Sequence, residues 1–225
     1  MKVIYVIIAS LLLVSAMAGN RKCRALALSG GGDKGSYEAA VYIALVNLLE
    51  PEDIAYDVLT GVSAGSLNAC GLSAFAPNEG PEASEFIFGL WNSISSSDIF
   101  TMWPKGILNG IFEQKGAVNN RPLIDFVTSK TQGRTVKRKV TFALADANNL
   151  DYVRYDYNAS DSIPDDLIES AIGSSAIPFV FPNIQRGDRV LVDGGSIWNL
   201  DIESAIRRCY EIIDDEEDII IDTIS

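Results

Sequence analysis

Ser63 lies at the centre of the segment Gly-Val-Ser-Ala-Gly, residues 61–65. The segment follows a short stretch, 57–60, that is typical of a strand, and precedes a helical stretch from about 66 to 76. A G-x-S-x-G turn between a strand and a helix exposes its serine hydroxyl, because the glycines permit a sharp turn. The N-terminus of the following helix favours negative charge there. The pattern predicts that Ser63 is a nucleophile; the alternative is a glycine-rich turn whose serine has no role.

Histidine is absent from all 225 residues. This excludes a Ser-His-Asp triad, a Cys-His pair and zinc sites with imidazole ligands. A serine nucleophile still needs a proton acceptor, which must then be a carboxylate or a lysine. Asp193 is the candidate, because it ends the apolar strand 190–192 and is followed by two glycines that allow close approach. The alternative is a plain Asp-Gly turn.

A second glycine-rich turn, residues 30–35, reads Gly-Gly-Gly-Asp-Lys-Gly between a strand and a helix. Free backbone N–H groups at a helix N-terminus bind anions, including the oxyanion that develops on an ester carbonyl. The spacing also matches a dinucleotide fingerprint, but that site needs an acid at the end of the next strand, and Asp57 lies at its start. Lys34 either adds positive charge to this turn or is a solvated residue at the start of the helix.

Alternating strands and helices must position these three turns. The strands are predicted at residues 24–29, 57–60, 140–145, 190–192 and 219–221, and the helices at 36–49, 66–76, 167–172 and 201–210. Such alternation predicts an α/β fold with a mostly parallel sheet, in which ligands bind at the carboxyl ends of the strands. The length suits one large domain or at most two small ones.

The middle of the chain, residues 86–112, is rich in aromatic side chains: Phe86, Phe88, Trp91, Phe100, Trp103 and Phe112. Apolar surface of this kind serves either as the wall or lid of a site for a lipid chain or as ordinary helix packing. Both interpretations remain open at this point.

Acidic residues outnumber basic ones by 30 to 18, for a net charge of −12. This balance argues against nucleic acid as a partner and against simple electrostatic attachment to anionic lipid. One basic cluster contains Lys130, Arg134, Lys137, Arg138 and Lys139, and it either contacts headgroups or forms a solvated loop. Hydrophobic residues make up 48% of the chain, so a substantial core can be buried.

The N-terminus has the features of a signal peptide over residues 1–18. Lys2 precedes an apolar run, residues 3–16, and Ala16-Met17-Ala18 provides small residues for cleavage. We therefore expect a secreted protein, or one in the lumen of the secretory pathway, whose mature domain is 19–225. The alternative is an uncleaved segment that anchors the protein to a membrane. An acidic run ends close to the strand 219–221, which raises the alternative that the domain is incomplete at its C-terminus.

Three cysteines follow the signal peptide: Cys23, Cys70 and Cys209. In an oxidising compartment one pair would form and one thiol would stay free, and the sequence leaves the pairing open. Cys70 lies in an apolar stretch and is interpreted as a small buried hydrophobe. Asn158 begins an Asn-Ala-Ser glycosylation sequon.

Together these segments resemble the patatin-like phospholipase family. Four blocks carry the resemblance, at residues 29–35, 61–69, 174–182 and 193–195, and it extends over about 25–205. The resemblance implies a three-layer α/β fold related to the α/β hydrolases, with a mostly parallel central sheet. It also implies that Ser63 is the nucleophile, Asp193 the general base and the Gly31 and Gly32 N–H groups the oxyanion hole, without a metal or cofactor. Leu200 stands where the family often has proline, and family domains commonly run further than this chain.

The resemblance and the residues lead to one functional expectation. We expect a lipid acyl hydrolase, a phospholipase A-type esterase, that forms an acyl-enzyme on phospholipid or acylglycerol at a membrane or micelle surface. The alternatives are a lipid acyltransferase that uses the same intermediate and a catalytically inactive binding or storage protein of the same fold. A nucleotide-binding module is a more distant alternative.

Overall fold

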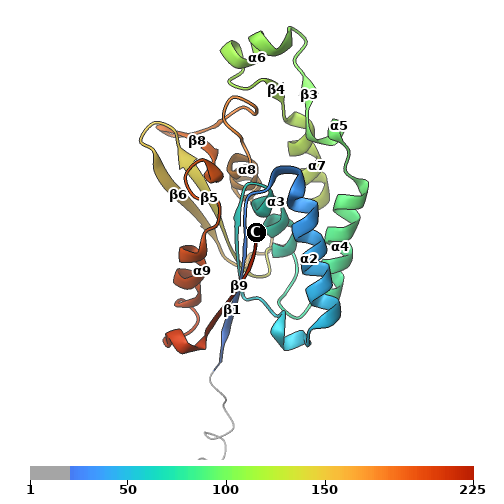
Figure 1. Ribbon diagram of the computed structural model, residues 1–225, viewed down its shortest axis with the longest axis vertical. Coiled ribbons are helices and arrows are strands. Elements are labelled where there is room, and N and C mark those ends of the chain that lie inside the picture. Colours follow the sequence, from blue (N-terminus) through green and yellow to red (C-terminus); the bar gives the residue numbers. More distant parts are fainter. Residues whose placement is uncertain (1–20) are drawn as a thin grey trace, which may run out of the picture.

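The computed structural model describes residues 21–225, so the signal peptide expected at 1–18 lies outside the described residues. A central sheet is covered on one face by α9 (Ile202–Cys209) and on the other by a layer that includes α2 (Gly35–Leu48), α3 (Ala64–Ser73) and α8 (Asp165–Ser174) (Figure 1). This arrangement confirms the predicted α/β fold. Within residues 21–225, no helix has the length and apolar character needed to cross a membrane.

Four parallel strands form the centre of the sheet, in the order β9 (Ile219–Ile224), β1 (Cys23–Leu28), β2 (Val58–Val62) and β5 (Lys139–Asp146). Every residue of β2 is buried, as is typical of a parallel strand covered on both faces. β9 pairs with β1 along its whole length, so the apolar run near the C-terminus forms one edge of the sheet.

Three further strands lie antiparallel to their neighbours around β5. β6 (Asp151–Tyr157) pairs with β5, and β8 (Arg189–Asp193) pairs with β5 and forms a hairpin with β7 (Ile184–Arg186). The sheet is therefore mostly parallel, as predicted, and the strand that ends at Asp193 is one of its antiparallel members. The turn at Gly187, where φ is +64°, reverses the chain between β7 and β8, so β8 enters the sheet from the opposite end.

The carboxyl ends of β2 and β8 nevertheless meet. Val62 ends β2 level with Ala143 of β5, and Asp193 ends β8 level with Leu144, the next residue of β5. β6 pairs with β5 from Val140 to Asp146, so it occupies the opposite edge of that strand. β2 and β8 must then share one edge of β5, and they approach each other end to end.

The remaining helices and strands come between α3 and β5 in the sequence. They are α4 (Gly80–Ser93), α5 (Ser96–Ile99), β3 (Thr101–Met102), α6 (Gly106–Glu113), β4 (Val118–Asn119) and α7 (Arg121–Thr131). Short 3-10 turns cover Gly32–Lys34, Pro51–Asp53, Gly194–Ser196 and Glu216–Asp218.

The aromatic segment 86–112 contains side chains of both expected kinds. Phe86 and Trp91 pack against the main core, as ordinary helix packing would have them, whereas Phe112 is exposed on α6. The segment is therefore neither wholly core nor wholly surface.

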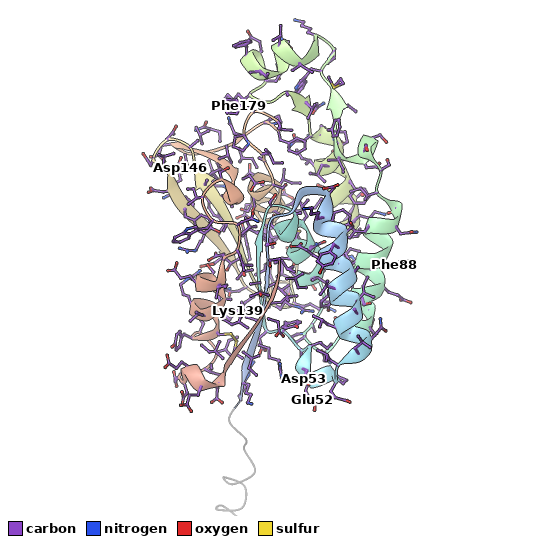
Figure 2. All side chains as sticks on the ribbon, in the orientation of Figure 1. Glu52, Asp53, Phe88, Lys139, Asp146 and Phe179 are labelled. Carbon is purple, nitrogen blue, oxygen red and sulfur yellow. A yellow bond between two sulfur atoms is a disulfide. The ribbon has the colours of Figure 1, made fainter. Side chains whose placement is uncertain are left out.

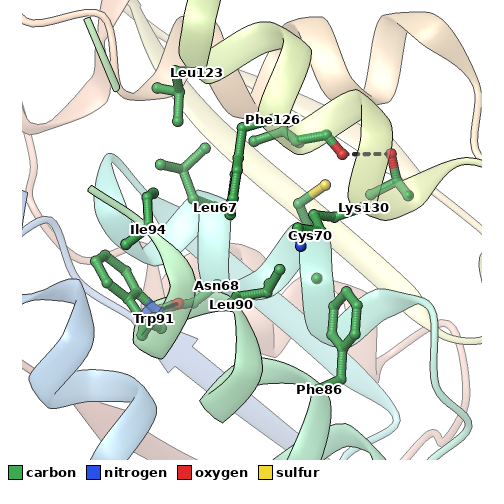
Figure 3. A pocket seen from close by; sticks show the side chains of 13 residues that line it. Leu67, Asn68, Cys70, Phe86, Leu90, Trp91, Ile94, Leu123, Phe126 and Lys130 are labelled. Carbon is green, nitrogen blue, oxygen red and sulfur yellow. Dashed lines mark hydrogen bonds between the residues drawn. The ribbon is translucent and has the colours of Figure 1, made fainter. Parts of the chain in front are cut away.

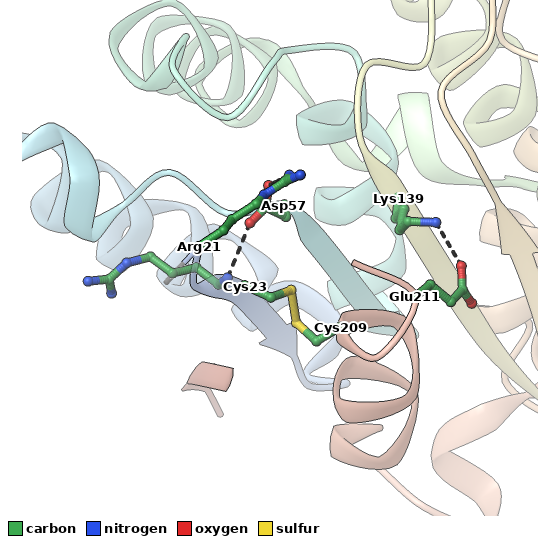
Figure 4. The surroundings of a disulfide bond; sticks show 7 residues. Arg21, Cys23, Asp57, Lys139, Cys209 and Glu211 are labelled. Carbon is green, nitrogen blue, oxygen red and sulfur yellow. Dashed lines mark hydrogen bonds and ion pairs between the residues drawn. A yellow bond between two sulfur atoms is a disulfide. The ribbon is translucent and has the colours of Figure 1, made fainter. Parts of the chain in front are cut away.

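Two hydrophobic clusters fill the faces of the sheet. The larger lies between the sheet and the helices α2, α3, α4 and α8, and the smaller lies under α9. Within the smaller cluster a disulfide joins Cys23 of β1 to Cys209 at the end of α9 (Figure 4). Cys70 is a free, buried cysteine, which confirms the expectation of one pair and one buried thiol.

The basic residues between 130 and 139 do not form one surface. Arg138 is buried and donates hydrogen bonds to three backbone carbonyl oxygens, those of Phe75, Tyr56 and Ala76. Lys137 pairs with Glu79, and Lys139 pairs with Glu211 (Figure 4), each at 2.7 Å. These contacts give Arg138, Lys137 and Lys139 structural partners, and contact of the cluster with headgroups stays a prediction.

Candidate active site

Ser63 occupies a strained turn between β2 and α3. Its φ of 51° and ψ of −122° lie in a region that residues other than glycine rarely adopt. Strain of this kind costs on the order of 1–3 kcal/mol and persists only where surrounding contacts hold it. The Ser63 N–H donates to Oγ of Ser174 at 3.0 Å, and Ser174 donates in turn to the carbonyl oxygen of Ala143 at 2.6 Å. Ser174 thus fastens the turn to β5.

The glycines on either side of Ser63 are required by close packing. A Cβ at Gly61 would lie 2.5 Å from Cα of Ser66, and a Cβ at Gly65 would lie 2.5 Å from the carbonyl oxygens of Leu28 and Ser29. The Gly65 N–H donates to the Ser29 carbonyl oxygen at 3.1 Å. The start of α3 is thereby pressed against the end of β1, as the G-x-S-x-G pattern predicts.

Asp193 is buried beside Ser63, at the point where β2 and β8 meet. Its N–H donates to the Ala176 carbonyl oxygen at 2.9 Å, and its Oδ1 accepts from the Gly195 N–H at 2.8 Å. Burial raises the pKa of Asp193, while hydrogen bonds from the Ser63 side chain and the Gly195 N–H lower it, and the net direction is upward. The two residues predicted as nucleophile and base are therefore brought together.

The first glycine turn lies against the serine. A Cβ at Gly30 would come within 3.0 Å of Cβ of Ser63 and within 2.2 Å of Oδ1 of Asn199. Asn199 holds this turn from both sides, since its carbonyl oxygen accepts from the Gly30 N–H at 3.0 Å and its Nδ2 donates to the Gly30 carbonyl oxygen at 2.7 Å. The same Oδ1 would lie 2.6 Å from a Cβ at Gly195, so Asn199 connects the glycine turn with the turn after Asp193.

Gly31 and Gly32 follow as the outer part of this turn. Gly32 has a φ of +59°, which favours glycine, and a Cβ there would meet nothing within 4 Å. Among the described residues, none accepts a hydrogen bond from the N–H of Gly31 or Gly32. Lys34 is exposed, and its Cβ lies 3.3 Å from the Cβ position of Gly31. The turn thus presents two free donors beside one cation.

A buried polar network supports the turn from behind. Nδ2 of Asn68 donates to Glu38 and to the Gly35 carbonyl oxygen, both at 2.9 Å, and Nε1 of Trp91 donates to Oδ1 of Asn68 at 2.8 Å. Ser29, just before the turn, also donates to Glu38, at 3.5 Å. Burial raises the pKa of Glu38 to about 7, although the hydrogen bonds from Asn68 and Ser29 lower it. The network ties the glycine turn to α3 and α4.

Sequence reasoning assigned no role to Glu38, Asn68, Ser174 or Asn199. Glu38 does carry a signal, because it lies three residues after Gly35 and so shares the helix face that packs against Ala64 of α3. An acid on a packed helix face needs a hydrogen-bonding partner. The other three are ordinary polar residues whose partners lie far away in sequence.

An apolar pocket lies farther along α3, between this helix, α4 and α7 (Figure 3). Its lining includes Leu67, Cys70, Trp91, Leu123 and Phe126, and it is almost wholly apolar. Asn68 belongs both to the pocket lining and to the polar network, so the pocket adjoins the elements that support the glycine turn.

Acidic side chains are dispersed around the site. Among residues 21–225, no group of three or more cysteine, aspartate or glutamate side chains is arranged to hold a metal ion. The arrangement of Ser63, Asp193 and the free N–H groups can activate a hydroxyl and hold a negatively charged oxygen, which is the chemistry of acyl transfer.

The family model described as patatin-like phospholipase matches residues 26–206. A curated protein named cGAMP-activated phospholipase, from Pseudomonas aeruginosa strain BWHPSA011 / Pa011, is 28% identical over 197 residues, which cover 81% of this chain and 55% of that protein. The crystal structure of VipD from Legionella pneumophila matches with a TM-score of 0.53 at 14% identity, over 91% of this chain and 50% of that one. The chain therefore spans about half the length of these two proteins.

Proposed function

Since the chain belongs to the patatin-like phospholipase family, we propose that it is a lipid acyl hydrolase of the phospholipase A type that uses a Ser63–Asp193 dyad. One observation carries the proposal. β2 and β8 end beside adjacent residues of β5, and this places the serine and the buried carboxylate within one site. The substrate class is phospholipid or acylglycerol.

Asp193 acts as the base. It accepts the proton of the Ser63 hydroxyl while Oγ bonds to the carbonyl carbon of the ester. When the tetrahedral intermediate collapses, the ester C–O bond breaks and the leaving alcohol takes the proton from Asp193. Water then attacks the acyl-enzyme while Asp193 accepts a proton from that water. The bond between the acyl carbon and Oγ of Ser63 breaks, and Ser63 takes the proton from Asp193. A raised pKa of Asp193 reduces the difference between the pKa values of the carboxyl group and the serine hydroxyl, and so favours proton transfer from Ser63 to Asp193.

The N–H groups of Gly31 and Gly32 stabilise the oxyanion. Two observations support this assignment. The two N–H groups have no hydrogen-bond acceptor among the described residues, and they belong to a turn that Asn199 holds in place. Loss of one such donor in an acyl-transfer enzyme costs about 2.7–4 kcal/mol of transition-state stabilisation. Lys34, exposed beside Gly31, supplies a weaker electrostatic contribution at the mouth of the site.

The apolar pocket along α3 holds part of the acyl chain. Its lining of Leu67, Trp91, Leu123 and Phe126 suits a hydrocarbon and offers few groups for a polar ligand (Figure 3). This assignment makes a prediction about specificity: long-chain esters should gain from the pocket, and short-chain esters should not.

Export from the cytoplasm is part of the proposal. The Cys23–Cys209 disulfide supports it, because disulfides persist in oxidising compartments. The signal-like residues 1–18 supply the route, with an uncleaved membrane anchor as the alternative. N-terminal sequencing of protein recovered from the medium and from membranes distinguishes the two.

Labelling with a fluorophosphonate probe tests the dyad. The wild-type protein should label, and Ser63→Ala and Asp193→Asn should not, because the first lacks the nucleophile and the second lacks the base. Ser129→Ala, which removes an exposed hydroxyl from α7, is the matched control and should label fully. A folded wild-type protein that does not label would overturn the proposal in favour of an inactive binding protein of the same fold.

A further inference from the structure

The segment from β3 to β4 forms an arm at one end of the molecule. β3 and β4 pair with each other as an antiparallel ribbon outside the main sheet, with α6 between them. Figure 1 shows α6 beyond the carboxyl ends of β1 and β2, on the side of the sheet where the candidate active site lies. The position of the arm therefore relates it to the site.

One face of α6 consists of apolar side chains that the rest of the described chain leaves exposed in large part. Ile107, Leu108, Ile111 and Phe112 lie at helical spacing on this face, and Leu108 and Phe112 are 71% and 79% exposed. The opposite face holds the arm together: a Cβ at Gly110 would lie 2.4 Å from the Trp103 ring. Packing within the arm thus uses one side of α6 and leaves the apolar side free.

The free apolar surface extends toward the active site. The N–H groups of Ala117 and Val118 donate to the carbonyl oxygens of Phe179 and Val180 at 2.8 and 3.1 Å. Phe179 is 78% exposed and lies below α6 in Figure 2. The same segment begins at Ala176, whose carbonyl oxygen accepts from the Asp193 N–H. The arm is therefore joined to the proposed base through one short, hydrogen-bonded segment.

The charge of the arm differs from that of the chain. The whole chain has 30 acids and 18 bases, whereas residues 101–119 contain one acid, Glu113, and two bases, Lys105 and Lys115. The two lysines are exposed at opposite ends of α6. Lysines that flank an apolar helix face are placed to meet lipid phosphates when that face enters the interface. If two copies of the chain paired through α6 about a two-fold axis, the lysines of one copy would instead lie near the lysines of the other.

We propose that α6 and the neighbouring Phe179 dock the protein on the surface of a zwitterionic phospholipid bilayer, with the apolar face of α6 inserted among the acyl chains. The inference rests on the proposed function in that the bilayer supplies the substrate of the Ser63 site. Docking through the arm would turn the carboxyl ends of β1 and β2 toward the lipid.

Vesicle binding tests the docking surface directly. Phosphatidylcholine vesicles are sedimented with the full chain carrying Ser63→Ala, so that hydrolysis cannot alter them. Adding Leu108→Gln and Phe112→Gln together should lower the partition coefficient by about tenfold or more, because two large exposed apolar side chains are lost. Phe88→Gln, a similarly exposed aromatic on α4 (59% exposed, Figure 2), is the matched control and should leave binding within about twofold.

A second measurement reports insertion at α6 itself, independently of any other anchor. The fluorescence that Phe112→Trp adds to that of the three native tryptophans should be quenched by phosphatidylcholine with brominated acyl chains, and the fluorescence that Phe88→Trp adds should be quenched much less. Equal quenching of the two, or equal vesicle binding by all variants, would overturn the proposal. So would sedimentation of the wild-type chain as a dimer that Leu108→Gln with Phe112→Gln converts to a monomer, because the surface would then be an interface between copies.

Hydrolysis of a soluble short-chain ester separates this inference from the proposed function. If the α6 variants, with Ser63 intact, keep this hydrolysis but lose hydrolysis of vesicles, both proposals are supported. If no variant hydrolyses the ester but the α6 variants alone lose vesicle binding, the docking surface is supported and the hydrolase is not. If ester hydrolysis is normal and the α6 variants bind vesicles as the wild type does, the docking surface is refuted and the hydrolase is supported.

Discussion

Glu38 should make the stability of the protein depend on pH, and Glu38→Gln should remove that dependence. The carboxyl group is buried on the first turn of α2, where it accepts hydrogen bonds from Asn68 and Ser29. Burial raises its pKa from 4.5 to about 7, because the charged form is poorly solvated there. A glutamine has nearly the same shape and can keep a hydrogen bond to each partner without ionising.

The sign and size of the effect follow from linkage. Below pH 4.5 the Glu38 carboxyl is protonated in both the folded and the unfolded chain, so it costs nothing. As the pH rises, the unfolded chain loses this proton first, and the free energy of unfolding falls until the pH exceeds the folded pKa of about 7. Each pKa unit corresponds to about 1.4 kcal/mol, so the complete loss is about 3 kcal/mol.

Urea unfolding at pH 5 and pH 8, followed by tryptophan fluorescence, measures this loss. The stability of Glu38→Gln relative to wild type should be about 2.5 kcal/mol greater at pH 8 than at pH 5, because part of the loss has already occurred at pH 5. Glu85→Gln, which removes an exposed carboxylate from α4, corrects for the change in net charge. A difference between Glu38→Gln and wild type that is equal at both pH values would refute the reasoning.

Three further predictions follow from the same structure. Cys23→Ser with Cys209→Ser opens a loop with a sequence separation of 186 residues, and should lower the free energy of unfolding in guanidinium by about 2–5 kcal/mol; an unchanged midpoint would contradict this. Gly65→Ala places a Cβ 2.5 Å from the Leu28 carbonyl oxygen, so α3 must shift, and ester hydrolysis should fall by more than about tenfold, whereas full activity would show that the turn tolerates the shift. Because the pKa of Asp193 is raised and a base must be ionised, the acid limb of kcat/KM against pH should lie above the ordinary aspartate value of 3.8; a limb at or below that value would argue against Asp193 as the base.

Much of the central fold could be predicted, because the strands that build it are short apolar runs, two of which lead into glycine turns. β1, β2 and β5 were each predicted within a few residues for this reason. β6, by contrast, was not predicted. It reads Asp-Tyr-Val-Arg-Tyr-Asp-Tyr, and its mostly half-buried or exposed residues reflect a position at the edge of the sheet, where polar side chains are tolerated.

The direction of β8 shows a second limit. The apolar run 190–192 predicts a strand that ends at Asp193, and this is confirmed. Whether the strand runs with β5 or against it depends on the hairpin with β7, a strand of only three residues that has no strong pattern of its own. Local propensity cannot determine such a direction, because it depends on which partner the strand finds.

The candidate site likewise has features that a local sequence pattern predicts and features that depend on distant partners. The turn at Ser63 could be predicted because G-x-S-x-G is a local pattern, but the contacts that hold its positive φ, from Ser174 and from the end of β1 against Gly65, are tertiary. The burial of Glu38 and the clamp of Asn199 on Gly30 involve partners up to 169 residues away, and no local pattern encodes them.

The sequence by itself predicted which residues could carry the chemistry: a serine on a sharp turn, an aspartate in place of the missing histidine, and glycines at a helix N-terminus. Only the tertiary structure decided that Ser63 and Asp193 meet. They are brought together because β2 and β8 pair with adjacent positions on one edge of β5, and backbone hydrogen bonds between strands set that register.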